Sequence, residues 1–349
     1  MPSLLERYAA FLPITDRTPR ITLGEGATPL VRSLWLERET GIDEVWLKCE
    51  GANPTGSFKD RGMVVAVAKA VETGSRAVLC ASTGNTAASA AAYAARAALP
   101  CTVVLPAGYV AVGKLVQAIA FGARIVAVRG AFDAALAIVR ELGESGEATL
   151  VNSINPHRIE GQKTAALEIC EALGDAPDAL FIPVGNAGNI TAYWRGFTQA
   201  HDAGIARSKP RLYGFQAEGA APIVRGMPVA DPRTVATAIR IGAPASWAGA
   251  VRARDESGGA IEAVSDEEIM DAYREVARHD GVFCEPASAA AIAGLRKRAS
   301  VRATKDTRRA VCVLTGNGLK DPDTARSLAG ELLEVDATAD AVRRALALA

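Results

Sequence analysis

Two patterns of hydrophobic positions alternate along most of this chain. Short runs of consecutive apolar residues, such as CTVVLP and ALFIPV, predict strands that are buried on both faces. Longer segments between them carry apolar residues at helical spacing, as in the segment 60–73. Because strand and helix alternate with short loops, the pattern indicates an α/β fold with mostly parallel sheets covered by helices.

The individual elements follow from the same pattern. Strands are expected at 44–50, 76–81, 101–106, 124–129, 149–153, 179–184, 211–219 and 310–315. Helices are expected at 60–73, 86–98, 112–122, 132–142, 162–173, 190–203, 266–279 and 288–298, with a short one within 1–20 and two in the C-terminal tail. A Ser265/Glu268 capping box begins the segment 266–279. The segment 220–263 is the least regular, and we expect it to form a binding loop.

The length of the chain predicts more than one core. A chain of 349 residues is too long for one ordinary hydrophobic core, so we expect two doubly wound α/β lobes. The smaller lobe is expected at 54–154 as a mobile insertion, and the larger lobe combines 1–53 with 155–349.

Composition and charge exclude several classes of function. The formal net charge is zero, so nothing favours binding to nucleic acid or to an anionic membrane. No apolar run reaches the roughly 20 residues of a membrane span, and the N-terminus lacks the pattern of a signal peptide. Six cysteines without a CxxC pair predict buried thiols in a reducing cytoplasm, and three histidines supply a metal site poorly.

One lysine stands in an unusual local sequence, NPTGSFKDRGM at 53–63. Gly and Pro interrupt regular structure before Lys59, and a helix pattern begins at Asp60. The apolar neighbour Phe58 favours loss of solvation, which lowers the pKa of an amine and makes it a better nucleophile. The alternative is an ordinary solvated lysine in the first turn of a surface helix.

Three predicted strands end in similar turns, in the sequences VLCASTGNTA, FIPVGNAGNI and CVLTGNGLK. In open α/β sheets the ligand site lies beyond the carboxyl ends of the strands. The second turn predicts a phosphate cradle of backbone N–H groups at a helix N-terminus. Its residues are Gly185, Asn186, Ala187, Gly188 and Asn189. The alternative is a tight turn that needs glycine for its geometry alone.

The other strand ends offer further polar groups. STGN at 82–85 suits a carboxylate, although Ser82 or Thr83 can equally be a helix cap. TGNG at 315–318 places the Thr315 hydroxyl at a strand end, where a simple turn is the alternative. VNSINPHR at 151–158 suits a second oxyanion, or else forms a loop with a solvated arginine. Its polar residues are Asn152, Ser153, Asn155 and Arg158.

A nucleophilic lysine, a small phosphate cradle and a lack of metal ligands together predict one cofactor, pyridoxal 5′-phosphate. This cofactor binds a lysine covalently, carries one phosphate and acts as an electron sink. A neutral hydroxyl such as Thr315 beside its ring nitrogen suits elimination and replacement chemistry.

The chain resembles the threonine synthases, which belong to the pyridoxal-phosphate-dependent enzymes of fold type II (tryptophan synthase β-like). The resemblance covers about residues 20 to 325 and rests on NPTGSFKDRGM, ASTGNTAASAAAYAA, PVGNAGNITAYWRG, TVATAIRIG, GVFCEPASAA and LTGNGLKDPD. It implies an active site in the cleft between two lobes, with most cofactor contacts on the larger lobe. It also implies a cytoplasmic homodimer, and a lyase that catalyses the last step of threonine biosynthesis.

The resemblance implies a role for each matching residue. Lys59 is the cofactor-bearing lysine and proton shuttle, with Phe58 beside it. Asn85 meets the cofactor's 3′-oxygen, residues 185–189 its phosphate, and Thr315 its ring nitrogen. The substrate carboxylate is expected at Ser82, Thr83 and Thr86, and the substrate phosphate at Asn152, Ser153 and Arg158.

The implied reaction converts O-phospho-L-homoserine and water to L-threonine and phosphate. Two anion sites fit this reaction, whereas the alternative, a threonine or serine dehydratase, needs only the cofactor's site. A third alternative is a cofactor-binding protein without catalysis. The chain departs from the family pattern at Ala27 and Ala243, where asparagine is common.

Overall fold

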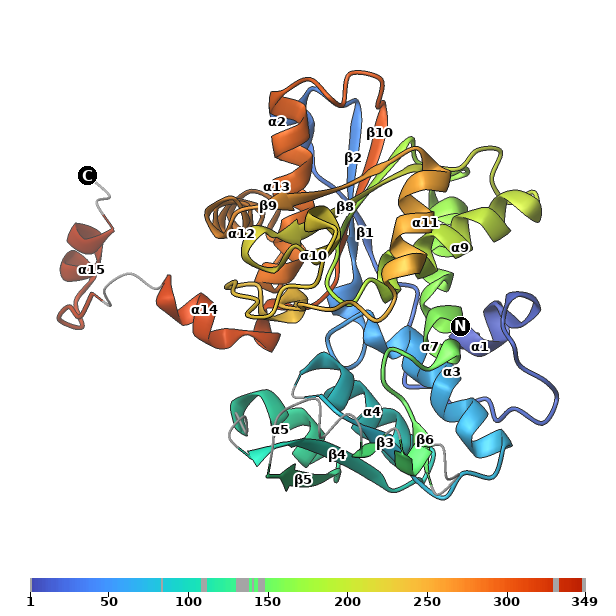
Figure 1. The fold of residues 1–349 in the computed structure, drawn as a ribbon. Helices are drawn as coiled ribbons and strands as arrows, with labels where there is room; N and C mark the ends of the chain where they lie inside the picture. The colour runs from blue at the N-terminus through green and yellow to red at the C-terminus, as the bar shows by residue number, and fades with distance from the viewer. Residues whose placement is uncertain are drawn as a thin grey trace.

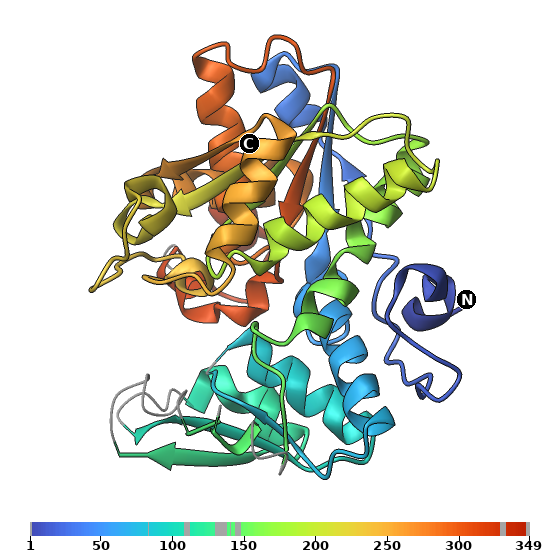
Figure 2. The same cartoon turned by 45° about the vertical axis from the view of Figure 1, so that its right-hand side comes forward.

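The computed structural model describes residues 2–82, 84–107, 112–129, 138–139, 141–143, 148–328 and 333–346. These residues form two α/β units, one built on a six-stranded sheet and one on a four-stranded sheet. The two units lie one above the other, and α3 and α7 run between them (Figures 1 and 2). The predicted α/β class with mostly parallel sheets is therefore confirmed.

The larger sheet has the strand order β1-β2-β10-β7-β8-β9, and all neighbours are parallel except the antiparallel pair β1 and β2. Its strands are β1 (Leu30–Arg32), β2 (Glu44–Cys49), β7 (Ala179–Pro183), β8 (Arg211–Ala217), β9 (Ala260–Val264) and β10 (Arg309–Leu314). Successive side chains of β7 enter opposite cores: Leu180 packs into one and Phe181 into the other. This explains the continuous apolar runs, because both faces of the sheet are covered.

Helices cover both faces of the larger sheet (Figure 2). The core that contains Phe181 also contains residues of α2, α12 and α13, and the core that contains Leu180 contains residues of α8, α9 and α11. These helices are α2 (Leu34–Thr40), α8 (Thr164–Leu173), α9 (Gly188–Asp202), α11 (Trp247–Ser257), α12 (Asp266–Asp280) and α13 (Pro286–Ser300). The Ser265/Glu268 capping box is present at the start of α12, as expected.

The smaller sheet is parallel and has the order β5-β4-β3-β6. Its strands are β3 (Val78–Cys80), β4 (Cys101–Pro106), β5 (Arg124–Val128) and β6 (Thr149–Leu150). Helices α3 (Lys59–Glu72), α4 (Asn85–Arg96) and α5 (Val112–Ala120) belong to the same stretch of chain. The expected helix at 132–142 lies largely outside the described residues, and the lobe boundary at 54–154 stays a prediction.

The remaining elements are short. They are α1 (Leu4–Arg7), α7 (Pro156–Gln162), α10 (Pro222–Arg225), α14 (Pro322–Ser327) and α15 (Ala339–Ala345), with 3₁₀ turns at Ala9–Phe11, Glu50–Ala52, Glu218–Ala220, Thr237–Ile239 and Gly318–Lys320. Helices α14 and α15 extend away from the rest of the chain, on the left of Figure 1. Within the described part of the chain, no helix is long and apolar enough to span a membrane.

Some elements differ from the sequence-based expectations. The segment 220–263, expected to be an irregular loop, contains α10, α11 and most of β9, and two of its glycines directly follow a helix, Gly226 after α10 and Gly258 after α11. Helix α2 is not among the expected elements. Arg158 lies on helix α7, whose first residue Pro156 follows an Asn155 cap, and not in a loop.

Candidate active site

The three similar turns lie at the carboxyl ends of β3, β7 and β10, and the last of them holds the lysine loop. The backbone N–H of Phe58 donates to the Thr315 carbonyl over 3.0 Å, and the Asn317 N–H donates to the Gly56 carbonyl over 2.9 Å. Ser57 and Gly316 form an isolated antiparallel bridge between these bonds. The backbone of TGNG therefore fixes the position from which α3 begins.

Lys59 is the first residue of α3, and its amine lies over the Phe58 ring, 4.0 Å from the ring centroid. Desolvation and, next, the Arg158 charge lower the pKa of Lys59 from 10.5 to about 7, while Glu285 opposes the shift. Solvent still reaches part of the residue, while its amine lies in a buried environment. A lysine with this pKa is partly neutral near neutral pH, as a nucleophile or a proton acceptor must be.

Asp60 fixes the turn before the lysine. Its buried carboxylate accepts from the Thr55 N–H over 2.7 Å, from the Thr55 hydroxyl over 2.6 Å and from the Ser89 hydroxyl over 2.6 Å. It lies in the first turn of α3, as predicted, but it is buried and links the lysine loop to α4. The loop is thus tied to both units.

A buried ionic cluster supports α3 two residues beyond the lysine. The carboxylates of Glu50 and Glu168 bind the Arg61 guanidinium at 2.6 to 2.8 Å, and Lys48 donates to Glu168 over 2.7 Å. All four side chains are nearly inaccessible to solvent. Two cations face two anions, so the charges within the cluster are balanced. Separating any one partner would leave an uncompensated buried charge, which is costly. The cluster therefore fixes the first turn of α3.

The turn at 185–189 has the geometry of an anion site. Ala187 adopts a left-handed conformation with φ 64°, and α9 begins at Gly188 without a cap from any described side chain. A Cβ on Gly185 would lie 2.9 Å from the Ile239 Cα, so only glycine fits there. Both polar side-chain atoms of Asn189 are buried, and neither has a hydrogen-bond partner among the residues described. Uncapped N–H groups and an unpartnered amide fit the phosphate of the predicted cofactor.

Thr315 and Asn85 meet at one carboxylate. The Asn85 Nδ2 donates to Glu285 over 3.1 Å, and the Thr315 hydroxyl donates to the other oxygen of Glu285 over 3.3 Å. Ser288 Oγ lies 2.9 Å from the Thr315 hydroxyl oxygen. The two residues predicted to contact different edges of the cofactor ring are thus brought together.

Arg158 is buried, and its charge has no carboxylate partner among the described residues. Its guanidinium donates to the Val151 carbonyl over 2.6 Å, while its Nε lacks a partner in the part of the chain that the structure describes. Burial lowers the pKa of Arg158 to about 10. Buried cations are normally paired, so this arrangement suits a bound anion.

The residues that precede Arg158 in sequence connect the two predicted anion sites. The Asn186 amide donates to the Ser153 hydroxyl, which joins the cofactor cradle to the VNSINPHR segment. The Asn152 side-chain carbonyl accepts from the Ala81 N–H over 2.8 Å, and its amide donates to the Ala81 carbonyl over 2.9 Å. Asn152 thereby fixes the backbone immediately before STGN, and its role toward a substrate stays a prediction.

The STGN turn precedes α4. The Ser82 hydroxyl accepts from the Gly84 N–H over 3.2 Å, and no described side chain caps α4, whose first residues are Asn85 and Thr86. Thr83 lies outside the described residues. Free helix N–H groups beside these polar side chains suit a carboxylate.

Reasoning from sequence does not find Glu285, Ser288 or the ionic cluster. The sequence predicts helix α13 only from residue 288, whereas α13 begins at Pro286 and Glu285 directly precedes it. Charged residues next to apolar runs, such as Glu50 after β2, are the available signal. Only the fold shows that their side chains converge.

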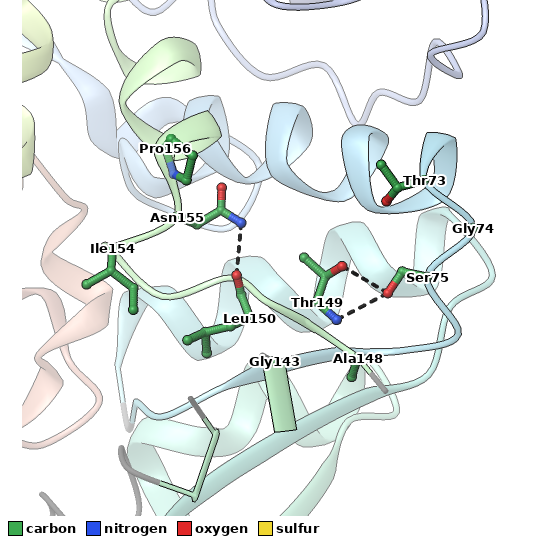
Figure 3. Close-up of a pocket in the computed structure, with 10 residues that line it drawn as sticks. All are labelled: Thr73, Gly74, Ser75, Gly143, Ala148, Thr149, Leu150, Ile154, Asn155 and Pro156. Atoms are coloured by element: carbon green, nitrogen blue, oxygen red, sulfur yellow. Dashed lines mark hydrogen bonds between the residues drawn. The ribbon is translucent and has the colours of Figure 1, made fainter. Parts of the chain in front are cut away.

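One cavity of about 710 Å³ lies between Ser75, Thr149 and Asn155, and Asn155 is the one described residue of the predicted anion sites that lines it (Figure 3). Its polar groups are already paired: Ser75 with Thr149, and Asn155 with the Leu150 carbonyl over 2.9 Å. None of the described residues that line it carries a charge. It therefore does not compete with the Lys59 region as a candidate active site.

Comparison with known proteins defines the class. Residues 21–316 match the family model for pyridoxal-phosphate dependent enzymes. The fold is similar to maize serine racemase, with a TM-score of 0.75 and 22% identity over 94% of this chain and 97% of that one. It is also similar to threonine deaminase isoform 2 from Solanum lycopersicum, with a TM-score of 0.74 and 23% identity over 86% of each chain. The chain is a pyridoxal-phosphate-dependent enzyme of this fold type.

Curated relatives identify the family within this class. Threonine synthase from Halalkalibacterium halodurans is 60% identical over 93% of this chain and 91% of that protein. Threonine synthase from Methanocaldococcus jannaschii is 49% identical over 97% of this chain and 86% of that protein. The chain belongs to the threonine synthase family, which confirms the resemblance seen in the sequence.

Proposed function

We propose that this chain converts O-phospho-L-homoserine and water to L-threonine and phosphate. The observation that carries the proposal is the buried guanidinium of Arg158, which acts on the pKa of Lys59 and lacks a carboxylate partner among the described residues. A substrate that brings its own phosphate needs a cation outside the cofactor cradle. The high identity to threonine synthases over nearly the whole chain supports the same reaction.

We assign the cofactor to the residues whose geometry fits it. Lys59 would hold the aldehyde carbon, residues 185–189 the phosphate, Asn85 the 3′-oxygen and Thr315 the ring nitrogen, with Phe58 beside the lysine. When bound, pyridoxal phosphate supplies an electron sink for the bonds at the substrate Cα.

Each protein group then has a task. Lys59, with a pKa near 7, moves protons at the substrate Cα and Cβ. The α4 N-terminus, with Ser82, Thr83 and Thr86, binds the substrate carboxylate. Arg158, Ser153 and Asn152 hold the γ-phosphate until it leaves as inorganic phosphate.

The decisive experiment incubates the cofactor-loaded protein with O-phospho-L-homoserine and measures threonine and phosphate together. Equal amounts of both products are expected. Ammonia and 2-oxobutanoate released from threonine, without phosphate release, would instead identify a dehydratase. Cofactor absorption without turnover of either substrate would identify a binding protein that has lost catalysis.

Arg158→Met tests the phosphate site. Because two or more charge-assisted hydrogen bonds to the substrate are lost, kcat/KM should fall by at least about tenfold. Stability should not fall in parallel, since the variant removes a buried charge that no described carboxylate neutralises. An unchanged kcat/KM for O-phospho-L-homoserine would remove Arg158 from the site.

Two wider assignments belong to the same proposal. Six cysteines without disulfides, five of them buried, suit a reducing cytoplasm, and the family resemblance suits a homodimer. We also propose that the unit at 54–154 moves against the rest of the chain when substrate binds. Hydrogen exchange with and without substrate measures that movement, and analytical ultracentrifugation measures the oligomeric state.

A further inference from the structure

Glu285 contacts two of the residues that we assign to the cofactor. It is 4% exposed and precedes the first turn of α13. One carboxylate oxygen accepts from the Asn85 amide, and the other accepts from the Thr315 hydroxyl. These two donors come from different units of the fold, so a single carboxylate aligns both.

The proton of the Thr315 hydroxyl is directed by a chain of hydrogen bonds. The Gly316 N–H donates to Ser288 Oγ over 3.0 Å, and the Ser288 hydroxyl has two acceptors for its own proton, the Thr315 hydroxyl at 2.9 Å and the Gly316 carbonyl at 3.4 Å. A hydroxyl has one proton, and Thr315 then donates its own to Glu285. In this arrangement Thr315 has no proton left for a ring nitrogen.

The arrangement reverses when Glu285 is neutral. A protonated carboxyl donates to Thr315, and the Thr315 proton becomes available to the ring nitrogen. Desolvation raises the pKa of Glu285, while its bonds to Asn85 and Thr315 and the charges of Lys59 and Lys320 lower it in part. Cys284 beside it is buried, and burial raises the pKa of its thiol, so it stays neutral where Glu285 titrates.

We propose that Glu285 is a positioning residue whose carboxyl, through Thr315 and with Ser288, decides whether the cofactor's ring nitrogen receives a hydrogen bond. The proposal rests on the contacts assigned above to Thr315 and Asn85. Glu285 acts through these two side chains and not by direct contact with the ring. Its effect is on the electronic state of the bound cofactor, which is visible without turnover.

The test is a pH titration of the visible absorption of the cofactor-loaded protein, together with the dissociation constant of pyridoxal phosphate. The native protein should show a one-proton spectral step whose midpoint lies above the usual pKa of a glutamate, because burial raises the pKa of Glu285. Glu285→Gln donates permanently to Thr315, so the step should disappear and the spectrum should stay in its low-pH form. The same step in Glu285→Gln would overturn the proposal.

Two further variants identify the titrating group. Lys320→Met removes a cation that faces Glu285, so the midpoint of the step should move to higher pH. Loss of the step in this variant would mean that Lys320 titrates and not Glu285. Glu285→Asp keeps the charge but shortens the reach to Asn85 and Thr315, so the step should persist while cofactor affinity falls about tenfold.

Failure of this proposal is separable from failure of the proposed cofactor contacts. Thr315→Ala and Asn85→Ala should each change the spectrum in the same assay. If they do so while Glu285→Gln leaves the step in place, only the role of Glu285 is wrong. If Glu285→Gln does not fold, Ser288→Ala provides the test instead. An unchanged midpoint of the spectral step in Ser288→Ala would overturn the proposal.

Discussion

Single residues of this protein are held in conformations that serve the site around Lys59. The low pKa of that lysine depends first on desolvation and then on the charge of Arg158, a residue far from Lys59 in the sequence. Local sequence predicts the desolvation through Phe58. It does not predict the second cation, because the approach of α7 to α3 is a property of the fold.

The lowered pKa of Lys59 makes the stability of the cofactor-free protein depend on pH. The unfolded chain holds this proton up to about pH 10.5 and the folded chain only up to about 7. Folding therefore becomes more favourable as pH rises between these values. The destabilisation caused by the lowered pKa of Lys59 is fully present below pH 7. Denaturant unfolding from pH 7 to 10 should show a steeper rise for the native protein than for Lys59→Met. Parallel curves would contradict the low pKa.

Ala27 adopts a strained backbone conformation. Its φ of 47° lies in the left-handed region, where asparagine and glycine are favoured over alanine. Ala27→Gly should therefore raise the free energy of unfolding by roughly 0.5–1 kcal/mol. The control is Ala95→Gly in α4, an exposed helical site where the same exchange should destabilise by about 1 kcal/mol. Urea unfolding of both variants checks the opposite signs.

At the scale of elements, the crossing of α3 and α7 sets the site. A Cβ on Gly62 would lie 2.4 Å from the Arg158 carbonyl oxygen, and one on Gly161 would lie 1.9 Å from the Arg61 carbonyl oxygen. These glycines let the two helix backbones touch, which brings Arg158 close to Lys59. Neither glycine has a positive φ, so close approach is their only requirement.

Alanine at Gly161 tests this crossing. Replacing glycine with alanine within a helix normally stabilises the folded protein by about 1 kcal/mol. Here the added methyl group would force the backbones of α3 and α7 apart. We expect Gly161→Ala to lower the free energy of unfolding by at least about 2 kcal/mol and to weaken cofactor binding. A variant of normal or greater stability in urea unfolding would show that the helices adjust without cost.

The sequence predicts most strands and the glycine-rich turns, but not the crossing of α3 and α7. Apolar runs predict most strands, because both faces of each sheet are buried, and the glycine-rich turns point to 185–189 and Thr315. Helix α7 is not predicted, because a segment of seven residues with a proline carries little periodicity. The roles of Glu285 and Arg61 are not predicted either, because both depend on partners more than 100 residues away.

At the scale of the whole molecule, a few contacts join the two units near the site. Besides the Asn85–Glu285 bond, Lys320 donates to the Thr55 carbonyl over 3.1 Å and also to the Gln117 side chain on α5. Lys320 follows the TGNG turn that holds the lysine loop. It therefore links α5 to the part of the chain that carries Thr315.

Loss of this link should loosen α5. In Lys320→Met, amides of residues 115–120 should exchange with solvent several-fold faster, because the helix loses its hydrogen bond to the other unit. Lys297→Met is the matched control, since its exposed pair with Glu268 lies elsewhere and contributes little. Hydrogen exchange measured by mass spectrometry checks both, and equal protection of α5 in the two variants would contradict the link.

The apolar interior crosses from one sheet to the other without interruption. Val78 and Val103 of the smaller sheet belong to the same buried cluster as Leu180 and Val311 of the larger sheet, with residues of α3 in it as well. An excised fragment 54–154 would expose one side of that interior to water, where each buried valine or leucine side chain is worth about 1.5–3 kcal/mol. The smaller unit therefore depends on the rest of the chain for its solubility, and a gene encoding it separately should yield insoluble protein.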